Sequence, residues 1–184
     1  MKSLAALRRA APSGAPMAAV AGAAAYVLVV VVTALLIVTE TGAAAAAHLN
    51  SVATFIPGIV AVVSLSRLYG QPLRTARGGA ALGASAAVLG AAAAYTVSAV
   101  FVGAGVFADP VAVAMARVAD LPAAEQETAL ALIAFVRSPL GIALDVLMAM
   151  AMSAAGGALA VKVGAWRRRG GLAVQPVRRD GQAG

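Results

Sequence analysis

The feature that most constrains this chain is a series of long apolar runs that contain almost no charged side chain. Residues 17–39 form a charge-free run that, as an α-helix, extends about 34 Å and exceeds a hydrocarbon core of about 30 Å. A helix that is apolar all round must face lipid or be enclosed by protein. A chain of 184 residues is too short to enclose several such helices. The sequence therefore predicts an all-α integral membrane protein.

Four runs of this kind predict a four-helix membrane bundle over residues 17–164. The composition agrees, since only 11% of the residues are charged, against about a quarter in soluble proteins. Residues 1–16 are expected to form a basic leader, and residues 165–184 a basic, disordered tail. The expected spans are residues 17–39, 43–66, 80–107 and 139–164.

The first run has a rival interpretation as a cleaved signal peptide, because Lys2, Arg8 and Arg9 precede it. Apolar cores of signal peptides usually hold about 7–15 residues, which is shorter than this run. We therefore expect it to stay in the protein as the first span. In the second run, Pro57 predicts a helix kink between residues 55 and 58, since proline removes a backbone donor.

The third connection, residues 108–138, breaks the apolar pattern. Asp109-Pro110, Asp120 with Pro122, and Ser138-Pro139 each resemble a helix start, with a capping side chain followed by proline in the first turn. The third of these starts opens the last span. The other two predict a pair of short helices at the outer membrane interface.

The cations indicate the orientation of the chain. With four spans, the leader, the loop 67–79 and the tail share one side, and that side carries twelve of the fourteen cations. Arg117, Arg137 and five of the seven acids lie on the other side. Short cytoplasmic loops retain Lys and Arg, so we expect both termini in the cytoplasm. The bias toward alanine, glycine and arginine is typical of a high-GC bacterial genome, so the expected location is the bacterial inner membrane.

The net charge of +7 does not indicate nucleic acid, because the cations flank apolar spans and no soluble platform is available to read bases. They are suited to anionic lipid headgroups, which attract juxtamembrane Lys and Arg. The residues assigned to headgroup contact are Arg67, Arg74, Arg77, Arg167, Arg168 and Arg169.

The third span carries small residues at spacings of three and four, which places them on one helix face. Such a face lets helix backbones approach closely, which is a main route to helix association in lipid. We therefore expect it to pack against another membrane helix. Its members are Gly79, Gly83, Ala86, Gly90, Ala94 and Ser98.

Ionisable groups inside spans are expensive and are therefore the first candidates for function. The expected spans place one polar cluster in the outer half of the membrane: His48, Asn50, Tyr95, Ser98 and Asp145. In the functional interpretation, Asp145 and His48 share a proton or bind a cation. In the alternative interpretation, Asp145 hydrogen-bonds Asn50, Tyr95 or Arg137 and fixes the helix register.

No combination of residues indicates an enzyme. The chain has one histidine and no cysteine, which excludes disulfides and thiolate metal sites. Met148 and Met152 share a helix face and could in principle hold soft cuprous copper. Without further ligands, we expect them to fill gaps in packing. No cofactor or metal is expected.

The layout resembles uncharacterised bacterial four-helix multi-pass membrane proteins. The resemblance rests on the basic loop 67–77 before a glycine-rich span, the Asp109-Pro110 break and the motif SPLGIAL at residues 138–144. It implies no activity. We expect a structural or accessory subunit that contacts a membrane-protein partner or another copy of itself. A small proton- or cation-linked transporter or channel and a holin-like pore former are the alternatives.

Overall fold

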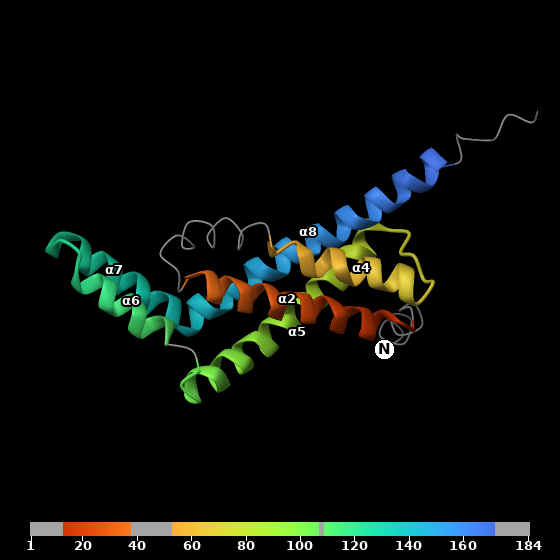
Figure 1. Cartoon of the computed structure of the whole chain (residues 1–184). Helices are drawn as coiled ribbons and strands as arrows, with labels where there is room; N and C mark the ends of the chain where they lie inside the picture. The colour runs from red at the N-terminus through yellow and green to blue at the C-terminus, as the bar shows by residue number, and fades with distance from the viewer. Residues whose placement is uncertain (1–12, 38–52, 107–108, 172–184) are drawn as a thin grey trace, which may run out of the picture.

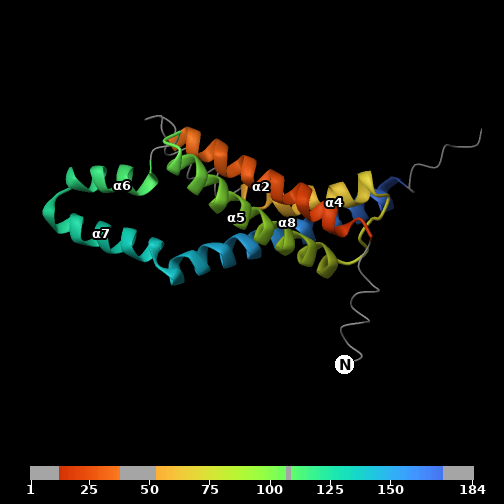
Figure 2. The same ribbon diagram turned by 90° about the horizontal axis from the view of Figure 1, so that it is seen from below.

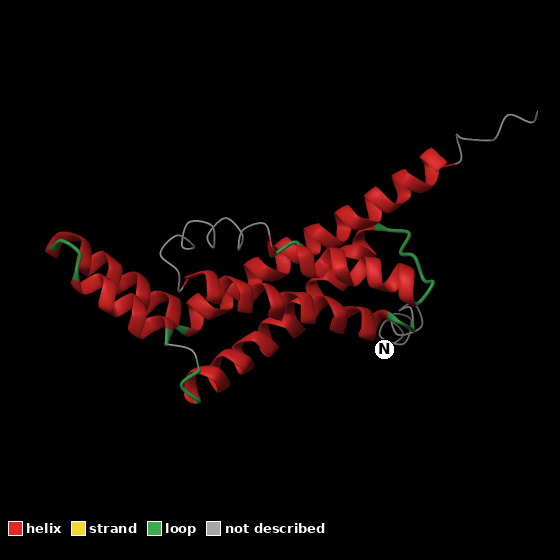
Figure 3. Ribbon diagram, viewed as in Figure 1, coloured by secondary structure: helices red, strands yellow, loops and turns green. Residues whose placement is uncertain are grey.

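The computed structural model describes residues 13–37, 53–106 and 109–171, and within these ranges the secondary structure is helical, with no strand (Figure 3). The all-α class is therefore confirmed. The helices are α2 (Ala15–Ile37), α4 (Ile56–Leu68), α5 (Ala76–Gly103), α6 (Pro110–Ala119), α7 (Ala123–Arg137) and α8 (Pro139–Gly171).

Three of these helices are long and apolar enough to cross a membrane: α2 over Ala15–Thr33, α5 over Ala76–Gly103 and α8 over Pro139–Arg168. This finding indicates a membrane location. Helix α4 has 13 residues, or about 20 Å, and falls short of a span by itself. Residues 43–52 of the expected second span, including His48 and Asn50, lie outside the described residues.

The long helices and α4 lie side by side (Figures 1 and 2). Helix α5 contacts both α2 and α8, and α4 contacts all three. The chain reverses between α4 and α5 through a short loop in which Gly70 has a positive φ of 61°. Thr75 then caps α5, since its hydroxyl accepts a hydrogen bond from the Gly78 amide at 3.1 Å.

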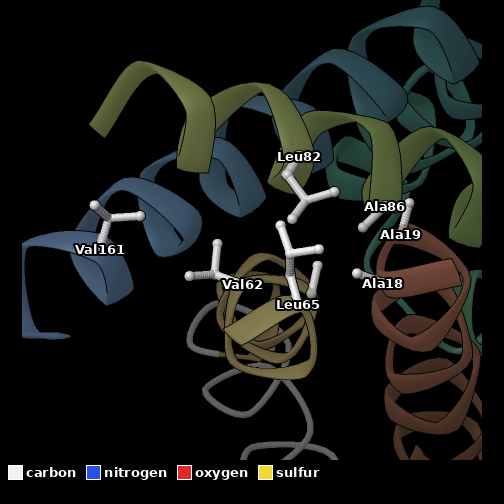
Figure 4. Packing of buried hydrophobic residues seen from close by; sticks show 8 residues of the cluster. Ala18, Ala19, Val62, Leu65, Leu82, Ala86 and Val161 are labelled. Carbon is white, nitrogen blue, oxygen red and sulfur yellow. The ribbon is translucent and has the colours of Figure 1, made fainter. Parts of the chain in front are cut away.

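Most of the residues buried between these helices are small, and a few larger apolar residues accompany them. The core cluster includes Ala18, Ala19, Val62, Leu65 and Leu82 (Figure 4), and Leu65 is completely buried. The large apolar side chains point outward in many places, as at Leu28, which is 64% exposed. Lipid solvates such side chains, whereas water does not, so this distribution suits a bilayer.

Pro57 lies in the first turn of α4 and not in the middle of a described helix. A proline there interrupts no helical hydrogen bond, because the first amides of a helix have no partner within it. Residues 54 and 55, immediately before α4, form a turn. The expected irregularity near residues 55–58 therefore takes the form of a helix start.

Helix α8 continues seven residues beyond the expected end of the last span and includes Trp166, Arg167 and Arg168. The expectation of a disordered tail from residue 165 is wrong for this part of it. No glycine or proline interrupts the helix between Gly164 and Gly170, and cations in the last turns are favourable at a helix C-terminus. The rest of the tail lies outside the described residues.

The third connection contains two short helices, as expected. Asp109 caps α6 by accepting a hydrogen bond from the Val111 amide at 2.9 Å. Asp120 does not cap α7, contrary to expectation. It ends α6 instead, and Pro122 occupies the N-cap of α7 without a side-chain hydrogen bond. The turn is closed by Gln126, whose amide donates to the Leu121 carbonyl at 2.8 Å.

Helices α6 and α7 form a hairpin that projects beyond the end of the bundle (Figures 1 and 2). Within the described residues, the two helices contact each other, and α7 also contacts α8. Ser138 starts α8 as expected, since its hydroxyl accepts from the Gly141 amide at 3.0 Å. The hairpin therefore extends away from the bundle and does not fold back across its end.

Candidate functional site

A polar cluster lies where α2, α5 and α8 meet. Tyr95 on α5 donates a hydrogen bond from its hydroxyl to Asp145 Oδ2 on α8 at 2.9 Å. Tyr26, on α2, lies beside them and lines the same small cleft of about 150 Å³. Ser98 also lines it, together with the apolar residues Val30, Ala91 and Ala94.

The structure brings together three of the five residues in the expected cluster, namely Tyr95, Ser98 and Asp145. His48 and Asn50 lie outside the described residues, so their distance from Asp145 is not defined. Tyr26 is a member that the sequence analysis missed. Tyr26 packs against Gly90 of α5, where an added Cβ would lie 2.6 Å from the Tyr26 Cβ. This close contact between α2 and α5 places Tyr26 beside the cluster.

Helix lengths indicate how far this cluster lies from the basic end of the bundle. Asp145 comes 22 residues before Arg167, or about 33 Å along α8. Tyr95 comes 18 residues after Arg77, or about 27 Å along α5. Both distances are close to the thickness of a hydrocarbon core, about 30 Å. If the arginines mark one membrane boundary, the cluster lies close to the other.

The chemistry of the cluster is limited. Among the described residues, Asp145 has one hydrogen-bond partner, Tyr95, and no group of three or more His, Cys, Asp or Glu residues is arranged to hold a metal ion. Arg137 ends α7 and is exposed. Met148 is largely exposed on α8. The arrangement provides a carboxylate held in place by a phenol.

The small-residue face of α5 is used within the chain, against two different neighbours. A Cβ at Gly79 would collide with the Gly157 carbonyl on α8, and one at Gly83 with the Ser153 carbonyl. Farther along the helix, Ala86 and Gly90 face Gly22 and Tyr26 on α2. Gly79, Gly83, Ala86, Gly90 and Ala94 are buried, whereas Ser98 is partly exposed.

Helix α8 supplies a matching face that the sequence analysis missed. Ser153 is completely buried, and its hydroxyl donates to the Gly83 carbonyl at 2.8 Å. A Cβ at Gly58 of α4 would also collide with the Ser153 carbonyl. The four-residue spacing of Ser153 and Gly157 is the sequence signal for this face, since small residues four apart favour close helix packing.

The basic residues gather at the opposite end of the bundle from the polar cluster. The Gly14 amide donates to Gln71 Oε1 at 3.2 Å, so the start of α2 lies beside the loop before α5. The start of α5 in turn touches α8 near Val161. This end therefore carries Arg67, Arg74, Arg77, Arg167 and Arg168. Arg169 belongs to the last turn of α8, but its side chain is outside the described part.

Comparison of the chain with protein-family models, with curated proteins and with solved structures finds no match. What the protein does must therefore be inferred from its residues and their geometry.

Proposed function

We propose that this chain is a four-span membrane protein of the bacterial inner membrane, with both termini in the cytoplasm, and that it acts as a structural or accessory subunit for another membrane protein. One observation carries the proposal. A closely packed helix bundle is joined to a projecting helical hairpin that exposes the apolar side chains Leu132, Phe135 and Val136.

The path of the chain supports four crossings. Helix α4 runs antiparallel to α2 and returns the chain to the loop that touches residue 14 (Figure 1). A returning segment that begins before α4 would complete the second span. The basic residues then share one end with the start of α2, which by the positive-inside rule is the cytoplasmic end.

The interior of the bundle supports a structural role over transport. At Gly58, Gly79 and Gly83 the backbones of α4 and α5 approach α8 so closely that one added methyl group would collide. At these contact points the helices leave no room for a solute between them. A transport pathway built on Asp145 would therefore have to run between subunits of an oligomer.

The hairpin is suited to contact a protein outside the bilayer. Its tip carries the exposed charges Arg117, Asp120, Glu125 and Glu127, which require water. Nearer the bundle, Leu132, Phe135 and Val136 occupy one face of α7 at the spacing i, i+3, i+4, and Leu132 is 61% exposed. Exposed apolar patches of this kind mark interaction sites.

A photo-crosslinking experiment in the native membrane tests the proposal. A photo-reactive amino acid at Leu132 should give one discrete adduct with a membrane protein, identified by mass spectrometry. The same probe at Leu28, which faces outward from the bundle on α2, is the control and should react mainly with lipid. Val136→Asp should abolish the Leu132 adduct, because it places a charge in the same face.

Reaction of Leu132 with lipid alone would place the hairpin in the bilayer and exclude the accessory role. An adduct that survives Val136→Asp would show that this face is not the contact, and would contradict the proposal in its present form.

A further inference from the structure

A groove at the basic end of the bundle is not explained by the proposed subunit role. It has a volume of about 360 Å³ and lies between α4 and α8, with the loop before α5 as its third wall. Small-molecule sites commonly have volumes of about 300–1,000 Å³. The groove is therefore large enough for part of a lipid.

The walls of the groove change from apolar to basic in the same direction on both helices. On α4, Ile59 and Val63 line it first and Arg67 lines its end. On α8, Leu159 and Val163 precede Arg167 in the same way. On each helix the first apolar residue lies eight residues before the arginine, or about 12 Å. Each helix thus lines the groove with an apolar stretch of the same length that ends at an arginine, and the two arginines lie at the same end of the groove.

Arg168 adds a third guanidinium to this end. Its Nη1 would lie 3.7 Å from a Cβ at Gly164, so the side chain extends back along α8 toward the groove. The described acidic residues lie far along the chain from this end. Four of them belong to residues 109–127, around α6 and α7, and the fifth is in the first half of α8: Asp109, Asp120, Glu125, Glu127 and Asp145. Among the described residues, these arginines therefore have no carboxylate nearby to neutralise them.

We propose that this groove binds one anionic phospholipid, with an acyl chain between α4 and α8 and the phosphate among Arg67, Arg167 and Arg168. Guanidinium groups bind phosphate through paired, charge-assisted hydrogen bonds. The apolar slot and the cationic end match the two parts of such a lipid in the correct order. The inference requires the chain to lie in a membrane, but it does not require the accessory role, so the two can fail separately.

Lipid binding to the purified full-length protein in detergent tests the inference, with native mass spectrometry as the readout. Phosphatidylglycerol and phosphatidylcholine with identical acyl chains are compared. We expect phosphatidylglycerol to bind about tenfold more tightly. Glycerol 3-phosphate, which has no acyl chain, should not displace it. Equal binding of the two lipids, or displacement by glycerol 3-phosphate, would overturn the proposal.

Two double variants distinguish lipid binding in the groove from a general attraction of lipid to surface charge. The double variant Arg67→Gln/Arg167→Gln should lower phosphatidylglycerol affinity about tenfold. The matched control, Arg74→Gln/Arg77→Gln, removes the same charge from the same end, but neither residue lines the groove, so affinity should be retained. An equal loss in both double variants would mean a nonspecific electrostatic attraction and would overturn the site.

A variant that fills the groove with a larger side chain tests the proposal even if the arginine variants do not fold. A Cβ at Gly164 meets only Arg168 within 4 Å, so Gly164→Leu extends into the groove without a backbone collision. We expect Gly164→Leu to lower phosphatidylglycerol binding at an unchanged oligomeric mass. A changed mass with unchanged lipid binding would identify the groove as a contact between copies of the chain and overturn the lipid site.

Discussion

At the residue scale, the chain reverses the usual relation between side-chain size and burial. Ala, Gly and Ser make most of the contacts between helices, and Ser153 is completely buried, with its hydroxyl donating to the Gly83 carbonyl. Many Leu and Val side chains point outward. In water such an arrangement would expose apolar surface, whereas in lipid it lets backbones approach and costs little. Small side chains are thus favoured inside this bundle, and a few larger ones such as Leu65 and Leu82 accompany them.

The hydrogen bond between Tyr95 and Asp145 leads to a prediction about coupling between α5 and α8. In a double-mutant cycle with Tyr95→Phe and Asp145→Ala, we expect a coupling free energy of unfolding of about 0.5–2 kcal/mol, because hydrogen bonds between membrane helices lie in this range. Unfolding in mixed detergent, monitored by circular dichroism, measures it.

Thr96 provides the control for this cycle. Its hydroxyl donates to the Ala92 carbonyl within its own helix at 2.8 Å, so Thr96→Val and Asp145→Ala should have additive effects. A Tyr95–Asp145 coupling no larger than this control would mean that the hydrogen bond contributes nothing to the stability of the bundle.

At the scale of the element, the helices are tied together by a few points of backbone contact. Helix α5 uses one end of its small-residue face for α8 and the other end for α2. Together with α4, which also contacts both, it joins α2 to α8, since the backbones of α2 and α8 do not approach each other within the described part. Damage to this face should weaken the whole bundle.

Gly83→Ala tests the contact between α5 and α8. The added Cβ would collide with the Ser153 carbonyl, and a backbone atom cannot move aside as a flexible side chain can. We expect the free energy of unfolding to fall by about 1–3 kcal/mol, the usual cost of overpacking. Thermal unfolding of the purified protein in detergent measures the change.

Gly103→Ala is the matched control, since nothing lies within 4 Å of a Cβ there. Alanine has the higher helix propensity, so this variant should be as stable as the original protein or slightly more stable. Equal stability of the two variants would show that the close approach at Gly83 does not hold α5 to α8.

At the scale of the whole molecule, charge is divided between the two ends. The arginines of the α4–α5 loop and of the end of α8 lie at one end, and the acids of the α6–α7 hairpin lie at the other (Figure 1). In a bilayer this division would fix one orientation, because short basic segments stay in the cytoplasm.

Single-cysteine labelling tests this orientation, and the absence of native cysteine leaves no background. A membrane-impermeant maleimide should label Glu125→Cys, at the hairpin tip, in intact cells with the outer membrane permeabilised. It should label Arg74→Cys, in the basic loop, only after the inner membrane is opened. The reverse pattern would invert the topology and contradict the positive-inside assignment.

Several elements could be predicted from the sequence because their signals are local. The apolar runs predicted α2, α5 and α8 to within a few residues at most ends, and side-chain caps marked the starts of α6 at Asp109 and α8 at Ser138. The prediction failed at Asp120, where the turn is too short to supply a separate cap, and at the end of α8. Both failures concern element boundaries.

By itself, the sequence determined the helical class, the membrane character and the grouping of cations, because hydropathy and charge act along each segment independently. Only the tertiary structure decided which neighbour each face of α5 meets, that Tyr26 joins Tyr95 and Asp145 at one cleft, and that apolar walls and arginines from α4 and α8 form one groove. These features depend on contacts between segments far apart in the chain, and each contact is selected by how well all the helices pack together.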